Sequence, residues 1–209
     1  MNSRLTHETI NKAITILAQR DPDLDAVIKK HGKPLILRRP GSIKTLVLLI
    51  LEQQVSLASA RAAYNRLSVA VGEFTPEKFL LLSDGEFRTA GVSRQKTNYI
   101  RDLSERLIDG TFELCRLPRM NDDAAREHLK QVKGIGSWTA DVYLLIGLMR
   151  PNIWPAGDVA LQAAVHSIKG LEARPSPELL TKIGEQWRPW RSVAARILWH
   201  YYLSTPRYK

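Results

Sequence analysis

Apolar residues recur at three- and four-residue spacing along most of the chain, and long segments that alternate apolar and polar positions are missing. That spacing is the period of an amphipathic helix, whereas alternation would indicate strands. Ile10, Ala13, Ile14 and Leu17 form one such stripe near the N-terminus. The pattern predicts an all-α fold of roughly ten helices joined by short loops. Further helices are expected at 42–54, 57–71, 93–108, 122–132, 137–149, 159–168, 177–187 and 190–203.

Local signals mark where several helices begin. A capping residue followed by proline at the first helical position occurs at Asp21-Pro22, Thr75-Pro76 and Ser176-Pro177, a combination typical of helix N-termini. One segment is ambiguous, because the continuous apolar run 46–51 is also typical of a buried strand. We expect a helix there, since the run lies inside the longer segment 42–54.

The domain organisation follows from the breaks in this pattern. No Gly/Ser-rich or Pro-rich linker divides the chain, and no internal repeat stands out. The one marked break is the irregular segment 150–157, which lies between two apolar helices. We therefore predict a single functional unit over 1–209, built from two helical lobes with a cleft between them. One lobe covers about 42–150, and the other covers about 1–41 together with 151–209.

Charge adds information about partners. The 209 residues include 31 Lys and Arg against 21 Asp and Glu, which gives a formal net charge of +10. A positive excess favours polyanionic partners, of which nucleic acid comes first, although many basic proteins only carry a solvated surface. An apolar fraction of 44 % is ordinary for a globular protein and argues against disorder.

Several classes of protein are excluded. The single cysteine, Cys115, rules out a disulfide within the chain, a four-thiolate iron–sulfur cluster and a Cys-rich zinc site. The five histidines show no ligand spacing, so we expect no cofactor and no metal held by side chains. No apolar run approaches the roughly 18 residues of a membrane span, and the N-terminus does not resemble a signal peptide. We expect a cytoplasmic protein, or a nuclear one in a eukaryote, with no membrane partner.

The segment 129–144 carries two glycines, Gly134 and Gly136, between two helical patterns. The chain must turn tightly there, and glycine leaves the backbone uncovered by side chains. Main-chain N–H groups at the start of the next helix can then approach a phosphate closely. Such contacts neutralise and position a phosphate without reading the base.

Two other interpretations of this hairpin compete. Gly-x-Gly could begin a dinucleotide-binding fingerprint, but Thr139 stands where the third glycine belongs, and a helix precedes the loop instead of a strand. It could also be an ordinary corner between two helices. The full spacing places apolar residues at 132 and 144 and the small Ala140 between them. This spacing resembles the helix-hairpin-helix motif of DNA-binding proteins.

The resemblance extends beyond the hairpin. The stretches 134–140 and 154–158 resemble the helix-hairpin-helix glycosylase superfamily, whose hairpin is followed by a Gly/Pro-rich loop that ends in aspartate. Within it, the stretches 53–56 and 187–192 are most similar to the 3-methyladenine DNA glycosylase II family, in its compact form. The likeness covers about 42–199. It implies an all-α, two-lobed enzyme that removes damaged bases from DNA.

The family pattern assigns the chemistry to Asp158. In this family the loop aspartate stabilises the cationic sugar that forms when the bond between base and deoxyribose breaks, or it activates water. From the residues alone, Asp158 would be read as the N-cap of the helix that begins at Val159, and the two roles are compatible. Many relatives carry a second acidic residue where Gly157 stands here, so the loop departs from the family at that point.

Position 138 decides the type of reaction that the resemblance implies. Members of the superfamily that also cut the strand place there a lysine, which forms a Schiff base with the sugar. Trp138 cannot do so, and a monofunctional glycosylase is expected. Lys133 is instead expected to contact a DNA phosphate. The hairpin is expected to contact DNA further through Gly134, Gly136, Ser137 and Thr139, and the family implies a monovalent cation held by the carbonyls of Val132 and Ile135.

The same resemblance implies a pocket for the extruded base. Trp138 and Trp199 occupy positions of pocket tryptophans, and indole faces attract a cationic alkylated purine. Tyr143 either adds to this wall or packs in the core, whereas Trp154, Trp187 and Trp190 are expected in the core. Gln54, in the turn 53–56, matches the side chain that wedges into the duplex in place of the flipped base. The alternative for Gln54 is a solvent-facing turn residue.

These observations lead to one expected function and two alternatives. We expect a monomeric monofunctional DNA glycosylase that hydrolyses the N-glycosidic bond of 3-methyladenine and 7-methylguanine in double-stranded DNA. The first alternative is a glycosylase of the same fold that acts on oxidised or mismatched bases. The second is a non-catalytic DNA-binding protein that uses only the hairpin and has no use for Asp158 or Trp138.

Overall fold

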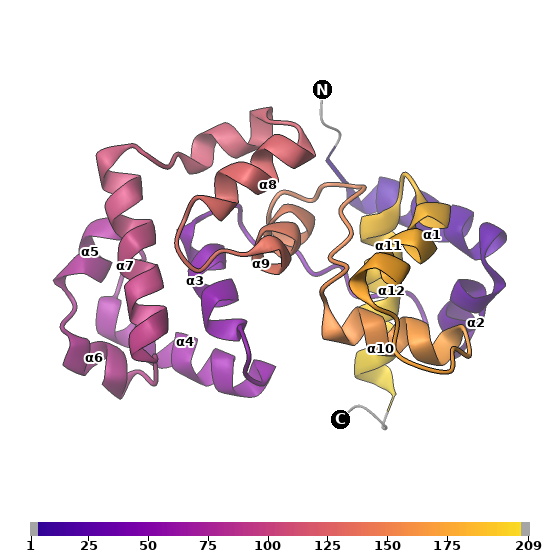
Figure 1. Cartoon of the computed structure of the whole chain (residues 1–209), viewed down its shortest axis with the longest axis horizontal. Coiled ribbons are helices and arrows are strands. Elements are labelled where there is room, and N and C mark those ends of the chain that lie inside the picture. Colours follow the sequence, from indigo (N-terminus) through magenta and orange to yellow (C-terminus); the bar gives the residue numbers. More distant parts are fainter. Residues whose placement is uncertain (1–3, 206–209) are drawn as a thin grey trace. The chain divides into compact units, whose positions relative to one another are not determined.

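The computed structural model describes residues 4–205, and all regular secondary structure in that range is helical (Figure 1). The prediction of an all-α fold is confirmed. The described residues form two compact units. The terminal unit consists of 4–38 and 144–205, and the central unit consists of 39–143. The chain passes between the units at 38/39 and at 143/144. The second of these boundaries lies inside an apolar segment, before the irregular segment 150–157.

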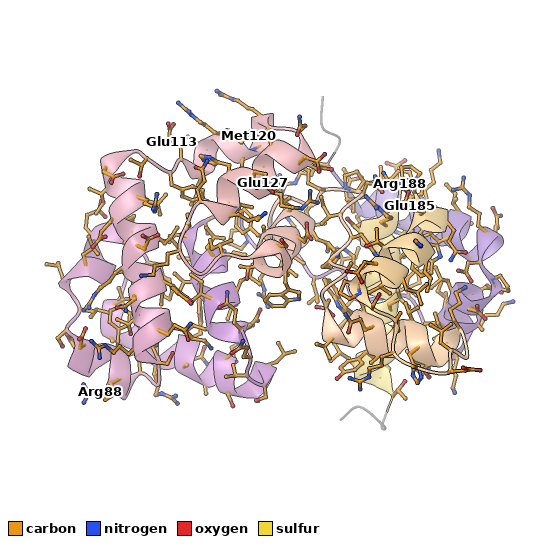
Figure 2. The ribbon with its side chains drawn as sticks, in the orientation of Figure 1. Arg88, Glu113, Met120, Glu127, Glu185 and Arg188 are labelled. Carbon is orange, nitrogen blue, oxygen red and sulfur yellow. The ribbon has the colours of Figure 1, made fainter. Side chains whose placement is uncertain are left out.

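Six helical elements, together with residues 144–147 of a π-helical turn, build the described part of the terminal unit around one apolar core. They are α1 (His7–Arg20), α2 (Pro22–His31), α10 (Val159–Ile168), α11 (Pro177–Gly184), the 3-10 turn η3 (Glu185–Trp187) and α12 (Arg191–Ser204). Helix α12 is the centre of this unit, because its residues 192–198 are all buried. Glu185 pairs with Arg188 and Arg191, and these charges hold the turn that leads into α12 (Figure 2).

A buried carboxylate ties α2 to the rest of the terminal unit. Asp21 is the N-cap of α2, and its side chain accepts a hydrogen bond from the Asp23 amide at 3.0 Å. The same carboxylate accepts from Lys169 Nζ at 2.8 and 2.9 Å and from Trp187 Nε1 at 2.8 Å. Burial alone would raise the pKa of Asp21, but the bonds and charge of Lys169, together with Trp187, outweigh it and lower that pKa. The predicted capping site is therefore also an ion-pair site.

A buried arginine on α12 joins two further segments of the same unit. The Arg196 guanidinium donates to the carbonyl oxygen of Leu37 and, at 2.9 Å, to that of Leu145. Burial lowers the pKa of Arg196 to about 10. These two carbonyls belong to the segments through which the chain leaves and re-enters the unit, so both ends of the central segment are anchored to one side chain.

All regular secondary structure in the described residues of the central unit is also helical. It contains α3 (Ile43–Glu52), α4 (Leu57–Val71), α5 (Pro76–Leu81), α6 (Asp84–Thr89), α7 (Arg94–Asp109), the 3-10 helix η1 (Leu114–Arg119), α8 (Asp122–Lys130) and α9 (Ser137–Val142). The ambiguous run 46–51 is helical and buried at every position. It forms the core helix of this unit, on which α4, α7 and α9 pack.

The predicted helix 137–149 differs from the structure in its second half. The α-helical part ends at Val142, and a π-helical turn follows at Tyr143–Gly147. Nearly the whole apolar run is buried, so hydrophobicity gives no sign of the change in hydrogen-bond register. None of the helices formed by residues 4–205 is long and apolar enough to cross a bilayer.

Candidate functional site

The two hairpin glycines, Gly134 and Gly136, have different structural roles in the central unit. Gly134 has φ +82°, a left-handed conformation that favours glycine. A Cβ atom placed on it would lie 2.2 Å from the ring of Tyr99. Gly136, the N-cap of α9, is extended with φ −89°, and an added Cβ would meet nothing within 4 Å. Gly134 is therefore required by the fold, whereas Gly136 keeps the surface open before the first amides of α9.

Polar contacts anchor the hairpin to its surroundings. The backbone amide of Lys133 donates to Asp102 Oδ2 of α7 at 2.9 Å. Arg126 of α8 donates from Nε to Asp141 Oδ1 of α9 at 2.7 Å, which joins the two hairpin helices. Burial would lower the pKa of Arg126, but the attraction of Asp141 outweighs it and raises that pKa. Neither Asp102 nor Asp141 was predicted as a site residue.

The turn between α3 and α4 is tied to the same hairpin. Gln53 ends α3, and its Nε2 donates to the carbonyl oxygen of Gly134 at 2.9 Å and to the hydroxyl of Thr139 at 3.0 Å. Gln54 follows, exposed and in a left-handed conformation with φ 55°. A cavity of about 250 Å³ is lined by this turn, by α4 and by the start of α7, where Lys96 lies.

The predicted DNA contacts of the hairpin are placed as follows. Lys133 and Ser137 are exposed, and Gly134 is half-buried. Thr139 is only 2 % exposed, and its hydroxyl accepts from Gln53. The Thr139 side chain therefore faces the interior, so a DNA contact at this residue stays a prediction and would have to come from its main chain at the start of α9.

The family also implies a monovalent cation at the hairpin carbonyls. The donors fit such an ion, because main-chain carbonyl oxygens are hard ligands that suit hard cations. Val132 and Ile135 would hold it. They are joined by a turn in which the Ile135 amide donates to the Val132 carbonyl at 3.0 Å. The carbonyl of Gly134 is committed to Gln53. A bound cation would supply positive charge for a phosphate.

The predicted catalytic carboxylate lies in the terminal unit. Asp158 is the N-cap of α10, and its Oδ1 accepts from the Leu161 amide at 2.9 Å. The same oxygen accepts from Trp199 Nε1 of α12 at 3.1 Å. The side chain is 7 % exposed. Two N–H donors from two helices therefore set the orientation of this carboxylate, and its negative charge lies at a helix N-terminus, which favours an anion.

The predicted pocket residues have different surroundings. Trp138 is the second residue of α9 in the central unit, and Trp199 lies on α12 in the terminal unit; both are half-buried. The bond from Trp199 to Asp158 was not predicted, since 41 positions separate the two residues. Tyr143 has no exposed surface. This burial favours the alternative that it packs in the core over the alternative that it lines the base pocket. Trp154 and Trp187 contact each other edge to face in the core, as expected.

Comparison with known proteins identifies the family. The model of the HhH-GPD superfamily, base excision DNA repair proteins, matches residues 47–189. The chain belongs to this superfamily. It is similar to the crystal structure of a DNA-3-methyladenine glycosidase from Bacillus halodurans, with 33 % identity, a TM-score of 0.75, and 91 % of this chain and 87 % of that one covered.

Further relatives agree with this assignment. The 3-methyladenine DNA glycosylase of Schizosaccharomyces pombe, solved in complex with abasic DNA, has a TM-score of 0.84 and 26 % identity over 95 % of this chain and 99 % of that one. The DNA-3-methyladenine glycosylase of Bacillus subtilis is 25 % identical over 195 residues, which cover 88 % of this chain and 64 % of the relative. The chain thus spans somewhat under two thirds of that relative's length. The resemblance to the 3-methyladenine glycosylase family is confirmed.

Proposed function

We propose that this protein is a monofunctional DNA glycosylase that, as a single copy, removes 3-methyladenine and 7-methylguanine from double-stranded DNA and leaves an abasic site. The observation that carries the proposal is the carboxylate of Asp158, oriented by the Leu161 amide and the Trp199 indole. The names of the relatives support the substrate class, and the relative solved with abasic DNA supports the product.

Asp158 acts on the deoxyribose. When the bond between C1′ and the base nitrogen breaks, its electron pair goes to the alkylated base and cancels the positive charge of that base. The sugar is left with oxocarbenium character, which a fixed carboxylate stabilises without reorganisation. Water then adds at C1′, and the proton that it loses goes to the solvent. Because the cationic base is already a good leaving group, one oriented carboxylate is enough.

The hairpin holds the DNA strand. Gly136 leaves the main chain at the start of α9 uncovered, and the amides of that turn donate to a phosphate, with the exposed Lys133 as an additional cationic contact. These contacts do not read the base, so they serve any lesion. The Asp102 and Gln53 bonds keep the hairpin in shape before DNA arrives.

Different residues bind the extruded base and fill the gap that it leaves in the duplex. Trp138 on the central unit and Trp199 on the terminal unit are each half-buried, and an indole face attracts a cationic purine by about 0.5–2 kcal/mol. Gln54 enters the duplex where the base was. Its exposure and left-handed backbone support this role, because strained residues cluster at functional sites.

The decisive experiment measures base release from methylated DNA, with the products identified by chromatography, for the wild type and Asp158→Asn. Asparagine keeps an N-capping oxygen and accepts the same two N–H donors, so the fold and duplex binding should remain. The negative charge is lost and the second oxygen becomes an NH2 group, so release of alkylated purines should fall by about 100-fold or more, on the order of an electrostatic catalytic contact. Asp25→Asn, which breaks an exposed Lys29 pair, is the matched control.

Other outcomes would change the assignment. Wild-type release by Asp158→Asn would refute the mechanism. Release of oxidised or mismatched bases from a panel of duplexes, without release of methylpurines, would favour the first alternative function, and binding without any release would favour the second. Borohydride treatment of wild-type reactions should trap no covalent adduct, because Trp138 cannot form a Schiff base. A trapped adduct would contradict the monofunctional reaction.

A further inference from the structure

One glutamine side chain joins two segments that lie far apart in the sequence of the central unit. The Gln53 amide nitrogen donates to the Gly134 carbonyl, 81 positions later, at 2.9 Å, and to the Thr139 hydroxyl, 86 positions later, at 3.0 Å. An amide nitrogen has two N–H donors, and both acceptors belong to the hairpin. The donor end of the side chain is thus committed to the hairpin, while the backbone of Gln53 belongs to the turn after α3.

The backbone of that turn is fixed independently by a lysine. Lys96 Nζ donates to the carbonyl oxygens of Leu51 and Gln53 at 2.8 and 2.9 Å. Its positive charge therefore lies against the C-terminal end of α3, where helix dipoles favour a cation. Burial lowers the pKa of Lys96. The half-buried Lys96 thus restrains the main chain of this turn through two carbonyl groups.

The residue presented by this turn is Gln54. Its left-handed conformation, with φ 55°, is unusual for a residue with a side chain and persists only where the surroundings impose it. Lys96 fixes the carbonyl of the preceding residue, and the Gln53 amide ties that residue to the hairpin. The exposed Gln54 is thereby held at a set position relative to Gly134 and α9.

We propose that Gln53 is a positioning residue that couples the turn bearing Gln54 to the hairpin that holds the phosphate. The phosphate contact and the inserted residue then belong to one rigid structure. Binding free energy gained at the hairpin therefore helps to drive the insertion of Gln54 into the duplex. This inference rests on the proposed function, because it assigns roles in base extrusion. It goes beyond that function by naming a residue that contacts neither the sugar nor the base.

The experiment places 2-aminopurine beside a stable abasic-site analogue in a duplex and records its fluorescence at saturating protein. The fluorescence rises when the base is unstacked. Gln53→Met keeps the length of the side chain but has no donor. We expect it to bind the duplex within about threefold of wild type, while its fluorescence gain per bound complex falls about tenfold, as expected for the loss of a buried hydrogen bond. Gln186→Met, in the terminal unit, is the same substitution at a side-chain amide whose bond to the carbonyl of Ile183 is local and exposed, and it should behave as wild type.

Gln53→Glu supplies a readout that a purely structural role would not produce. A carboxylate opposite the Gly134 carbonyl repels it, whereas a protonated carboxyl can donate to it again. The fluorescence gain of this variant should therefore recover as the pH falls from 8 to 5, relative to wild type at each pH, because a half-buried position beside two acceptors favours a protonated carboxyl, against the opposing positive charge of Lys96. If Gln53→Met fails to fold, the pH dependence of Gln53→Glu relative to wild type is the test of the coupling role.

The failures are distinguishable. A wild-type gain retained in Gln53→Met, or a Gln53→Glu variant that follows wild type at every pH, overturns the coupling role and leaves the glycosylase proposal intact. A wild-type protein that binds the duplex without any fluorescence gain, and releases no base from methylated DNA, overturns the proposed function and the coupling role with it.

Discussion

The two hairpin glycines allow a sharp prediction, because an alanine at Gly134 should affect folding, whereas an alanine at Gly136 should affect DNA binding. In Gly134→Ala the new methyl would lie 2.2–2.5 Å from three ring atoms of Tyr99, and the backbone would keep φ +82°. In Gly136→Ala the methyl would meet nothing within 4 Å, with φ −89°. The first substitution is therefore expected to damage folding, and the second is expected to damage only what approaches from outside.

The magnitudes follow from two physical terms. A left-handed conformation costs an alanine about 1–2 kcal/mol, and forcing a side chain out of a packed site costs about 1–3 kcal/mol. Gly134→Ala should therefore lower the free energy of unfolding by about 2–5 kcal/mol, which many domains with a total of about 5–15 kcal/mol survive. Gly136→Ala has neither term and should change stability by less than about 0.5 kcal/mol.

Urea unfolding at pH 7, followed by circular dichroism, measures both effects. The steric part can be isolated with Tyr99→Ala, which removes the ring that the Gly134→Ala methyl would strike. The double variant should be less destabilised than the sum of the two single variants by about 1–3 kcal/mol, the packing term. Additivity within about 0.5 kcal/mol would refute the steric argument and leave the backbone conformation as the only cause.

DNA binding completes the comparison. In Gly136→Ala the methyl covers the surface before the first amides of α9, so a phosphate is held further away. Loss of one charge-assisted hydrogen bond predicts an affinity for an abasic duplex about tenfold weaker than wild type, equal to about 1.4 kcal/mol. Fluorescence anisotropy at fixed salt measures it. An unchanged affinity in a correctly folded Gly136→Ala protein would show that the phosphate is not held there.

Two further predictions concern the terminal unit. Asp21→Asn should lower the free energy of unfolding by about 3 kcal/mol at pH 7. It should also make that free energy fall less steeply as the pH is lowered. Because the folded pKa of Asp21 is lowered, its contribution is complete above the unfolded value of about 3.9 and is lost as the pH falls through the folded value; urea midpoints between pH 7 and pH 2 test this, and an unchanged acid slope would contradict it. Gly157→Asp should fold normally, since its Cβ meets nothing within 4 Å. It should also change the rate of base release, because a second carboxylate adds negative charge beside Asp158, where the cationic sugar is expected to form, and an unchanged rate would place the new carboxylate away from the reaction.

Sequence signals located the helices wherever a cap and an apolar stripe agree. Ser56, whose hydroxyl accepts from the Ser59 amide, begins a helix with the predicted bounds 57–71, and the helix 159–168 after Asp158 also matches. In both cases the information is local, since a capping side chain reaches only three residues ahead. Helix Asp84–Thr89 was overlooked although Ser83 and Glu86 form a capping box, a signal that the sequence does contain.

The contacts that shape the hairpin could not be predicted in the same way. Gln53, Lys96 and Asp102 act through partners that lie 31 to 86 positions away, and spacing along the chain says nothing about such pairs. They depend on how α3, α7 and α9 pack. The resemblance to the family named the hairpin as the expected DNA contact, with Thr139 among the residues expected to make it. Packing turned that side chain inward, because its hydroxyl is the acceptor that the Gln53 amide requires.

Asp158 shows why the two roles expected for it belong together. A cap on α10 needs an oxygen that is held toward the Leu161 amide, and a group that stabilises a cationic sugar needs an oxygen whose direction is set beforehand. The Leu161 and Trp199 donors provide both through Oδ1. The orientation therefore comes from capping and the chemistry comes from charge. Asparagine separates them, because it preserves the first and removes the second, and an aspartate that served only as a cap would not distinguish the two residues.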